Sequence, residues 1–203
     1  MFDNFPMAAY GTLDRPTYHA DFYRHLTEAA SLDKLERGQH FKEPGFPSWE
    51  AFTAGNWDQA LKLTGERRAR YAEQIRDAQD RRRTERRLRV VDFPITPYVQ
   101  WEMHVLRVRV DEGDDIRVLD ARALADIEQQ RLVPEVVILG DTVMYGAQYD
   151  KHGNAAGARR YTERALIGET RDGFNTLYQR GENFLDFFHR EIAPLDAPQQ
   201  HDQ

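Results

Sequence analysis

The residues best suited to bind a small molecule follow three short apolar runs in the second half of the chain, at 88–93, 116–119 and 136–139. These residues are Thr96, Tyr98, Asp120, Arg122, Gly140 and Asp141. If the runs are parallel strands, their carboxyl ends share one rim, where helix N-termini offer free N–H groups to an anion. An anionic or polar small molecule could then bind between Thr96 and Arg122, with Asp141 as orienting acceptor or as a candidate general base. We favour the alternative, in which Thr96 and Asp120 cap helices while Arg122 and Asp141 are solvated or paired.

A second candidate group consists of Tyr98, Trp101 and Glu102, on the helix that Thr96 and Pro97 are expected to open. Two aromatic rings with a carboxylate one helical turn from Tyr98 could line a ligand pocket. We favour core packing for these residues, because an indole as large as Trp101 is usually buried. Glu102 is then free to pair with Arg87 or Arg89 across the sheet edge.

A basic run offers a third kind of site. Residues 65–89 hold ten Arg against five acidic residues, and the candidate patch is Arg81, Arg82, Arg83, Arg86 and Arg87. Guanidinium groups contact phosphate well, so the run could bind nucleic acid. Against this, cations favour a helix C-terminus, no aromatic residue interleaves the run, and the whole chain carries a net charge of −6. We favour a solvated helix end; docking onto an acidic protein surface is the remaining alternative.

Other catalytic and metal-binding patterns are missing from the sequence. The chain has no Cys, and its serines are Ser31 and Ser48, of which Ser48 is better explained as a helix cap than as a nucleophile. His19 and His25 are six residues apart rather than the four of a helical metal site. Neither a Walker A pattern nor a dinucleotide fingerprint occurs. We therefore expect no metal and no cofactor.

The composition predicts a soluble protein. A chain of 203 residues with 40% hydrophobic content can form one domain with an appendage. No window approaches 18 apolar residues, and the N-terminus lacks the pattern of a signal peptide. A cytoplasmic location is the expectation, and the absence of Cys fits a reducing compartment.

The first 87 residues divide into two predicted segments. Residues 1–47 are rich in aromatics, Gly and Pro and are expected to form an arm with one helix at 17–37. Residues 48–87 read as a helical lead-in, capped by Ser48 and broken near Gly55 or Gly65.

Residues 88–192 are predicted to form an α/β domain. Strands at 88–93, 116–119 and 136–139 alternate with helices from Thr96 and at 121–131, which gives a parallel βαβαβ core with right-handed crossovers. The end of the first helix is ambiguous, because 106–110 also alternates like a strand. An antiparallel hairpin, 143–149 with 157–162, and a C-terminal helix at 171–191 extend the core, and 193–203 is expected to be a flexible tail.

Several short motifs in this order resemble one family. They include 48–52, the run 86–102, Pro134 to Gly140, Tyr149-Asp150 with Gly153, and Gly181-Glu182 before Phe187-Phe188. Together they look like the actinobacterial family of unknown function DUF6879, over roughly residues 48–192 with the arm outside. The resemblance implies an accessory protein found beside helix-turn-helix regulators, and it implies no established catalytic residues.

A more distant similarity is to degenerate phospholipase-D-like domains that act as regulatory modules. Active members carry His-x-Lys followed, after four intervening residues, by Asp. Here His40-Phe41-Lys42 begins that pattern, but Pro47 stands at the Asp position. Phosphodiesterase chemistry of that kind is therefore not expected.

The preferred hypothesis is a non-catalytic regulatory or protein-interaction module that senses a small polar ligand and partners a helix-turn-helix DNA-binding protein. The rival is an uncharacterised hydrolase or transferase with its site at the strand carboxyl ends. A nucleic-acid binder or toxin-like nuclease acting through the Arg-rich helix end is the third possibility. A monomer and a homodimer are equally compatible with the sequence.

Overall fold

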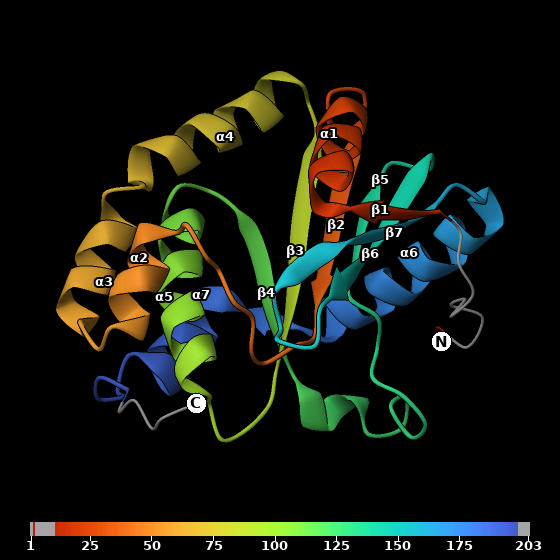
Figure 1. Cartoon of the computed structure of the whole chain (residues 1–203). Helices are drawn as coiled ribbons and strands as arrows, with labels where there is room; N and C mark the ends of the chain where they lie inside the picture. The colour runs from red at the N-terminus through yellow and green to blue at the C-terminus, as the bar shows by residue number, and fades with distance from the viewer. Residues whose placement is uncertain (1, 3–10, 199–203) are drawn as a thin grey trace.

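The computed structural model describes residue 2 and residues 11–198. Within this part of the chain, eight strands form one mixed sheet in the order β1-β7-β6-β5-β2-β3-β4-β8, with helices on both of its faces (Figure 1). The strands are β1 (Thr12–Asp14), β2 (Ser31–Glu36), β3 (Thr84–Val91), β4 (Asp115–Asp120), β5 (Val136–Leu139), β6 (Val143–Tyr149), β7 (Ala155–Tyr161) and β8 (Glu182–Asn183). Most of the predicted arm and tail is described, but residues 1, 3–10 and 199–203 lie outside the described residues.

The helices connect the strands and cover both faces of the sheet. They are α1 (Arg15–Leu26), α2 (Pro47–Thr53), α3 (Trp57–Gly65), α4 (Arg68–Asp80), α5 (Pro97–Asp111), the 3-10 turn η1 (Ala121–Leu124), α6 (Arg164–Arg180), α7 (Phe184–Phe187) and the π-helical turn η2 (Phe188–Ile192). No helix among the described residues is long and apolar enough to cross a membrane.

The predicted α/β class is confirmed, but the strands that run parallel are not the three that were predicted. The parallel pairs are β2 with β3 and β3 with β4, whereas β5 runs antiparallel beside β2. The predicted βαβαβ order is therefore wrong at its third strand. A parallel return needs a crossover of a dozen or more residues, usually a helix. The predicted helix at 121–131 is only the short turn η1, because residues 125–131 offer Ile127 as their one large apolar side chain.

The central strand of the sheet comes from the predicted arm. The helix expected at 17–37 ends at Leu26, and residues 31–36 form β2, which hydrogen-bonds to β5 on one side and β3 on the other. The sequence hides this strand because Leu32 and Leu35 stand at a helical spacing, among charged residues that find partners inside the protein. Asp33, for example, is fully buried and accepts a hydrogen bond from Arg86 Nε at 2.8 Å.

The predicted helical lead-in contains three helices, α2 to α4, which are separated at Gly55, whose φ of 77° favours glycine, and again after Gly65. The predicted role of Ser48 as a cap is wrong. Phe46 occupies the N-cap position ahead of Pro47, and the buried Ser48 hydroxyl instead donates to the Ala60 carbonyl and accepts from Trp101 Nε1. Residues 84–87 belong to β3 rather than to the helix.

The elements with strong local signals lie close to their predicted bounds. Thr96 caps α5, and its hydroxyl accepts a hydrogen bond from the Val99 amide at 3.2 Å. β4 and the β6–β7 hairpin also match. The C-terminal helix expected at 171–191 instead spans 164–180 and ends at Gly181, where a Cβ atom would come within 3.0 Å of Leu88 and Arg117.

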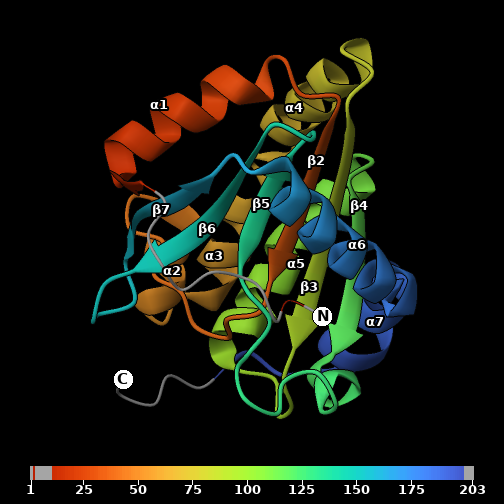
Figure 2. The ribbon, with the colours of Figure 1, turned by 90° about the vertical axis from the view of Figure 1, so that its right-hand side faces the viewer.

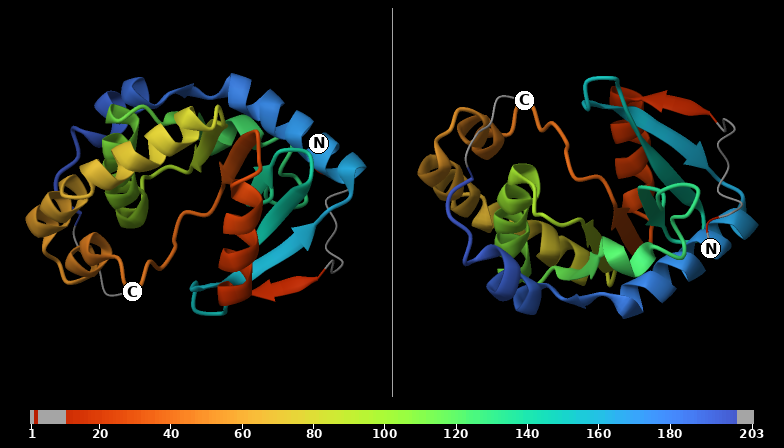
Figure 3. Two further views of the ribbon diagram at one scale, coloured as in Figure 1. Left: turned by 90° about the horizontal axis from the view of Figure 1, so that it is seen from above. Right: turned by 90° about the horizontal axis from the view of Figure 1, so that it is seen from below.

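Three apolar cores fill the two faces of the sheet. On one face α6 covers a core that contains Leu35, Leu88 and Phe174. On the other face one core lies under α5 and its neighbouring helices, and a second core lies under α1 (Figures 2 and 3). The two cores on this second face are separate, and the middle of the sheet between them carries charged side chains.

The central position of β2 predicts the effect of truncating Leu35, which is 1% exposed. Leu35→Ala should lower the free energy of unfolding by about 2–5 kcal/mol, because it leaves a cavity between the sheet and α6. Leu132→Ala, at a residue 59% exposed, should change it by no more than about 0.5 kcal/mol. Urea denaturation of both variants measures this, and a small effect at Leu35 would contradict the placement of β2.

Candidate functional site: a charged cleft over the central strands

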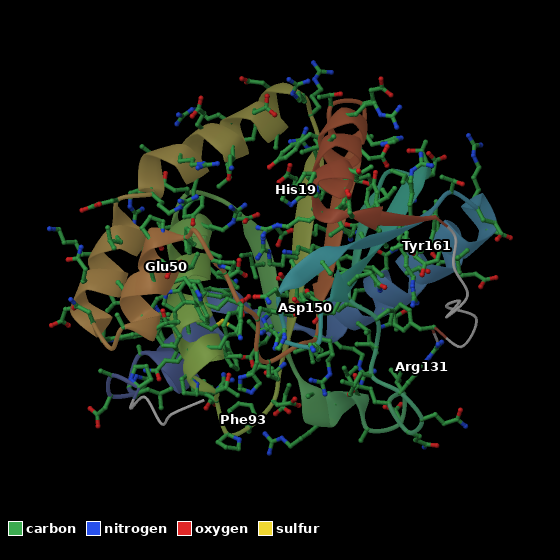
Figure 4. The ribbon with its side chains drawn as sticks, in the orientation of Figure 1. His19, Glu50, Phe93, Arg131, Asp150 and Tyr161 are labelled. Atoms are coloured by element: carbon green, nitrogen blue, oxygen red, sulfur yellow. The ribbon has the colours of Figure 1, made fainter. Side chains whose placement is uncertain are left out.

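The residues predicted to form a strand-end site are not brought together. Thr96, Asp120 and Arg122 follow β3 and β4, near Phe93 at the lower end of the molecule in Figure 4. Asp141 follows β5, which is antiparallel, so it lies at the other end of the sheet, where the Gly140 amide donates to the Ser31 carbonyl at 2.9 Å. Asp141 therefore has no access to a ligand bound between Thr96 and Arg122.

The strand-end rim is also filled by the segment that follows β2. Arg37 donates hydrogen bonds to Asp92 and to Glu128, each at 2.8 Å from a guanidinium nitrogen. The Gln39 side chain donates to the Val90 carbonyl and accepts from the Asp92 amide, both at 2.9 Å. These contacts close the rim with the protein's own polar groups.

Thr96, Asp120 and Arg122 serve local structure. The Thr96 hydroxyl caps α5 and donates to the Gln39 carbonyl at 2.9 Å. Asp120 caps η1 and pairs with Arg122, whose side chain is 80% exposed. Capping and pairing, the interpretation favoured from the sequence, describe these three residues.

The second predicted group, Tyr98, Trp101 and Glu102, is both buried and adjacent to open space. Tyr98 is 3% exposed and Trp101 2% exposed, and their rings pack against Trp49 at centroid distances of 5.7 and 5.2 Å. All three residues also line a cavity of about 400 Å³ between α4, α5 and the sheet. The structure thus combines the two roles that the sequence left as alternatives.

We call this cavity the charged cleft. Its charged lining residues come from α1, β2, the segment 37–46, α4, β3 and α5: Arg15, Lys34, Glu36, Glu43, Arg67, Arg70, Arg87, Glu102 and Arg109. Six are cations and three are carboxylates, which leaves an excess of three positive charges. A smaller cavity of about 140 Å³ shares Arg15, Lys34 and Glu36 and continues along α1 past His19, which is labelled in Figure 4.

The floor of the cleft is a row of paired charges on β2 and β3. Alternate residues of a strand point to the same face, so Lys34 and Glu36 of β2 stand beside Arg87 and Arg89 of β3, their register partners. The Glu36 carboxylate lies 2.5 Å from Lys34 Nζ and 3.2 Å from Arg87 Nη1.

A buried ion pair then connects the sheet to α5. Arg89 Nε donates to Glu102 Oε2 at 2.7 Å, and its Nη1 donates to the Val90 carbonyl, also at 2.7 Å. The sequence left Arg87 and Arg89 as alternative partners of Glu102, and the structure pairs it with Arg89. Arg89 is completely buried, and its Nη2 has no hydrogen-bond partner within the described part of the chain.

The two buried carboxyl groups of the cleft have opposite pKa shifts. Burial disfavours ionisation of Glu36, but Arg87, Lys34 and Arg89 outweigh it and lower the pKa to about 2. For Glu102, burial dominates over the attraction of Arg89, and the negative charge of Glu36 adds to it, so the pKa is raised. Glu36 is therefore firmly ionised, whereas Glu102 is easier to protonate.

The walls carry cations without acidic partners. The Arg67 guanidinium lies over the Phe46 ring at 4.4 Å and the Tyr71 ring at 5.6 Å. Among residues 11–198, no carboxylate comes within ion-pair distance of Arg15, Arg67 or Arg70, whereas Arg109 is engaged by Asp114 at 2.6 Å. The sequence analysis did not include Arg67 and Arg70 in a candidate site, and it missed the contribution of β2 and α4 to the cleft. The available signal was the high density of charged residues within 31–36 and 84–89.

The predicted basic patch does not form one surface. Arg81 pairs with Asp77 at 2.8 Å, and Arg83 is buried and pairs with Glu85 at 2.7 Å. Arg86 points to the opposite face of the sheet, toward Asp33, and Arg87 points into the cleft. Arg82 is exposed, with a φ of 54°. The run that looked continuous in the sequence is divided among four environments.

Metal ligands do not cluster in the described residues: no group of three or more His, Asp or Glu side chains is arranged to hold an ion there. The cleft instead offers guanidinium groups, carboxylates and aromatic rings, the groups that bind small charged organic molecules.

Comparison with known proteins supports the predicted family and extends its span. The model of a family described as a domain of unknown function (DUF6879) matches residues 20–189. The expected start near residue 48 is wrong, because the match includes β2 and most of α1. No curated protein matches the chain.

The pKa of Glu36 predicts a pH dependence of stability. Because folding lowers this pKa from 4.5 to about 2, ionised Glu36 stabilises the fold above about pH 4.5, and the contribution is lost as the pH falls toward 2. Glu36→Gln should cost about 3–5 kcal/mol at pH 7, since it leaves Lys34 and Arg87 unpaired. The difference in unfolding free energy between wild type and variant should shrink between pH 4.5 and 2.

Chemical denaturation at a series of pH values tests this. Glu73→Gln, at an exposed residue of α4 outside the cleft, is the control and should follow the wild-type profile. Parallel curves for wild type and Glu36→Gln across this pH range would contradict the assigned role of Glu36.

Proposed function

Because the chain belongs to the DUF6879 family, whose description assigns no activity, we propose its function from the charged cleft: it is a regulatory module that binds a small anionic ligand without transforming it. The observation that carries this proposal is the set of cations without an ion-pair partner among residues 11–198, Arg15, Arg67 and Arg70, around a cavity whose floor cations already have carboxylate partners.

The size and chemistry of the cleft suit such a ligand. Small-molecule pockets commonly have volumes of about 300–1,000 Å³, and the cleft measures about 400 Å³. A guanidinium group presents a rigid fork of donors that matches a carboxylate or a phosphate. Arg67 is held in place by stacking on Phe46, and its Nε is buried without a hydrogen-bond partner among the described residues. A preorganised, incompletely satisfied guanidinium favours binding of an anion.

The regulatory part of the proposal rests on which helices contribute the arginines of the cleft walls. Arg67 and Arg70 belong to the helical group that packs on α5, whereas Arg15 begins α1, which packs on β1 and β7. An anion bound between them would connect two groups of elements that have separate apolar cores. Such a bridge would favour one relative position of the two groups and so change the surface to which a partner protein binds. The partner implied by the family resemblance is a helix-turn-helix DNA-binding protein, and it stays part of this proposal.

An enzyme that uses the same cleft is the second candidate. The opposite pKa shifts of Glu36 and Glu102 favour it, because acid–base catalysis commonly uses two carboxyl groups with separated pKa values. A hydrolase or transferase would convert a bound ligand, and Glu102→Gln would retain binding but lose turnover. A binding module would return the ligand unchanged.

The anion-binding proposal predicts the effect of removing the wall arginines. Calorimetric titration with inorganic phosphate, citrate and adenosine monophosphate should show binding of at least one of them, weakened by added salt. Arg67→Ala combined with Arg70→Ala should weaken that binding at least about tenfold, since a hydrogen bond to a charged group contributes about 1.5–3 kcal/mol.

Arg76→Ala is the matched control, because Arg76 is an exposed residue of the same helix and does not line the cleft. It should leave the affinity within about twofold of wild type. Equal affinity of wild type and the Arg67/Arg70 double variant would contradict the proposal, as would a failure of all three anions to bind.

A further inference from the structure

Glu43 is the cleft carboxylate that lacks a cation. It lies on the segment between β2 and α2, and the Tyr98 hydroxyl donates a long hydrogen bond of 3.4 Å to its Oε1. In the described part of the chain, no Lys, Arg or His nitrogen comes within 4 Å of its carboxylate. Lys34 contributes an attractive charge, but its ammonium group is engaged by Glu36 at 2.5 Å. Glu43 thus contrasts with Glu36 and Glu102, which both have arginine partners.

A positive charge next to Glu43 would stabilise its ionised carboxylate. Glu43 is an exposed residue, yet the surrounding protein shields its carboxylate from part of the water, and this desolvation raises the pKa of Glu43. Glu102 and Glu36 raise it further, against the opposing effect of Lys34. A ligand cation at this point would relieve the repulsion among three carboxylates.

The aromatic ring beside Glu43 is that of Tyr98, which lines the cleft and donates to the carboxylate. Behind it lie Phe41 at a centroid distance of 5.4 Å and Trp49 at 5.7 Å. The faces of aromatic rings attract ammonium groups, and a carboxylate combined with such rings is a common way to bind a protonated amine.

Phe46 connects the position of Glu43 with that of Arg67, two residues that have no ion-pair partner in the described part of the chain. Glu43 and Phe46 are three residues apart, and Phe46 carries the Arg67 guanidinium on its ring at 4.4 Å. Three residues of backbone span at most about 11 Å. A short flexible molecule could therefore contact Glu43 with one end and Arg67 with the other inside the same cavity.

We infer that the ligand of the charged cleft is a small zwitterion, whose anionic group binds Arg67 and Arg70 and whose protonated amine binds Glu43 beside Tyr98. This inference rests on the proposed anion-binding function and adds Glu43 as the residue that determines specificity. A simple anion fills half of the site, and a molecule with both charges fills all of it.

The probes are straight-chain ω-amino acids from glycine to 8-aminooctanoate, each compared with the carboxylic acid of the same length without the amine. Titrations followed by backbone amide shifts in NMR spectra give the affinities and show where each probe binds. At least one amino acid should bind about tenfold more tightly than its matched acid. Glu43→Gln should remove this advantage and bind the acids at least as tightly as the wild type does, because a negative charge leaves the cleft, whereas Arg67→Ala with Arg70→Ala should weaken both series.

Two further variants separate recognition from structure. Glu43→Asp retracts the carboxylate by one methylene, so the preferred amino acid should become about one methylene longer. Glu73→Gln is the matched control and should bind both series as the wild type does.

The outcomes distinguish the two proposals. Acids that bind as tightly as every amino acid would overturn the zwitterion inference and leave the anion site intact. A Glu43→Gln variant that loses both series equally would overturn the specific role of Glu43. Absence of binding by both series would contradict the anion site itself.

Discussion

The buried pairing of charges on β2 and β3 is the constraint on which the rest of the structure depends. Lys34, Glu36, Arg87 and Arg89 all point to the face of the sheet that also carries α5. Buried ions are costly unless they are paired, so α5 must place Glu102 against Arg89, and Glu36 must lie between Lys34 and Arg87. Apolar helices cannot close over this strip, and the two cores on that face stay apart. The cleft is the direct consequence.

The same charges argue for a function beyond stability. Replacing a buried ion pair by well-packed apolar residues is often neutral or stabilising, so stability alone does not account for Arg89 and Glu102. The segment 37–46 contributes to two regions of the protein. Its beginning closes the strand-end rim through Arg37 and Gln39, and its end contributes Glu43 and Phe46 to the cleft. Because the usual ligand site of an open α/β sheet is closed, we propose the face of the sheet as the place where a ligand binds.

The parts of the fold that the sequence predicted correctly have local causes. Thr96 and Pro97 start α5 through a cap and a fixed φ, and the β6–β7 hairpin is joined by a short turn. The errors concern partners distant in sequence. The sequence of β2 looked helical because its charged side chains find their partners, Arg86, Arg87 and α5, only in the folded protein. β5 pairs with β2, so its direction could not be predicted without that strand. Tyr98, Trp101 and Glu102 could be grouped from the sequence because one helix carries them, whereas Glu43 and Arg67 come to line the same cavity only in the folded chain.

The most direct test of the cleft as an anion site is a crystal structure of the protein soaked in selenate, located by the anomalous scattering of selenium. The account predicts a selenate ion in the charged cleft, with its oxygens within hydrogen-bond distance of the Arg67 and Arg70 guanidinium groups. Selenate bound only outside the cleft, with both arginines paired to carboxylates of the protein, would contradict it.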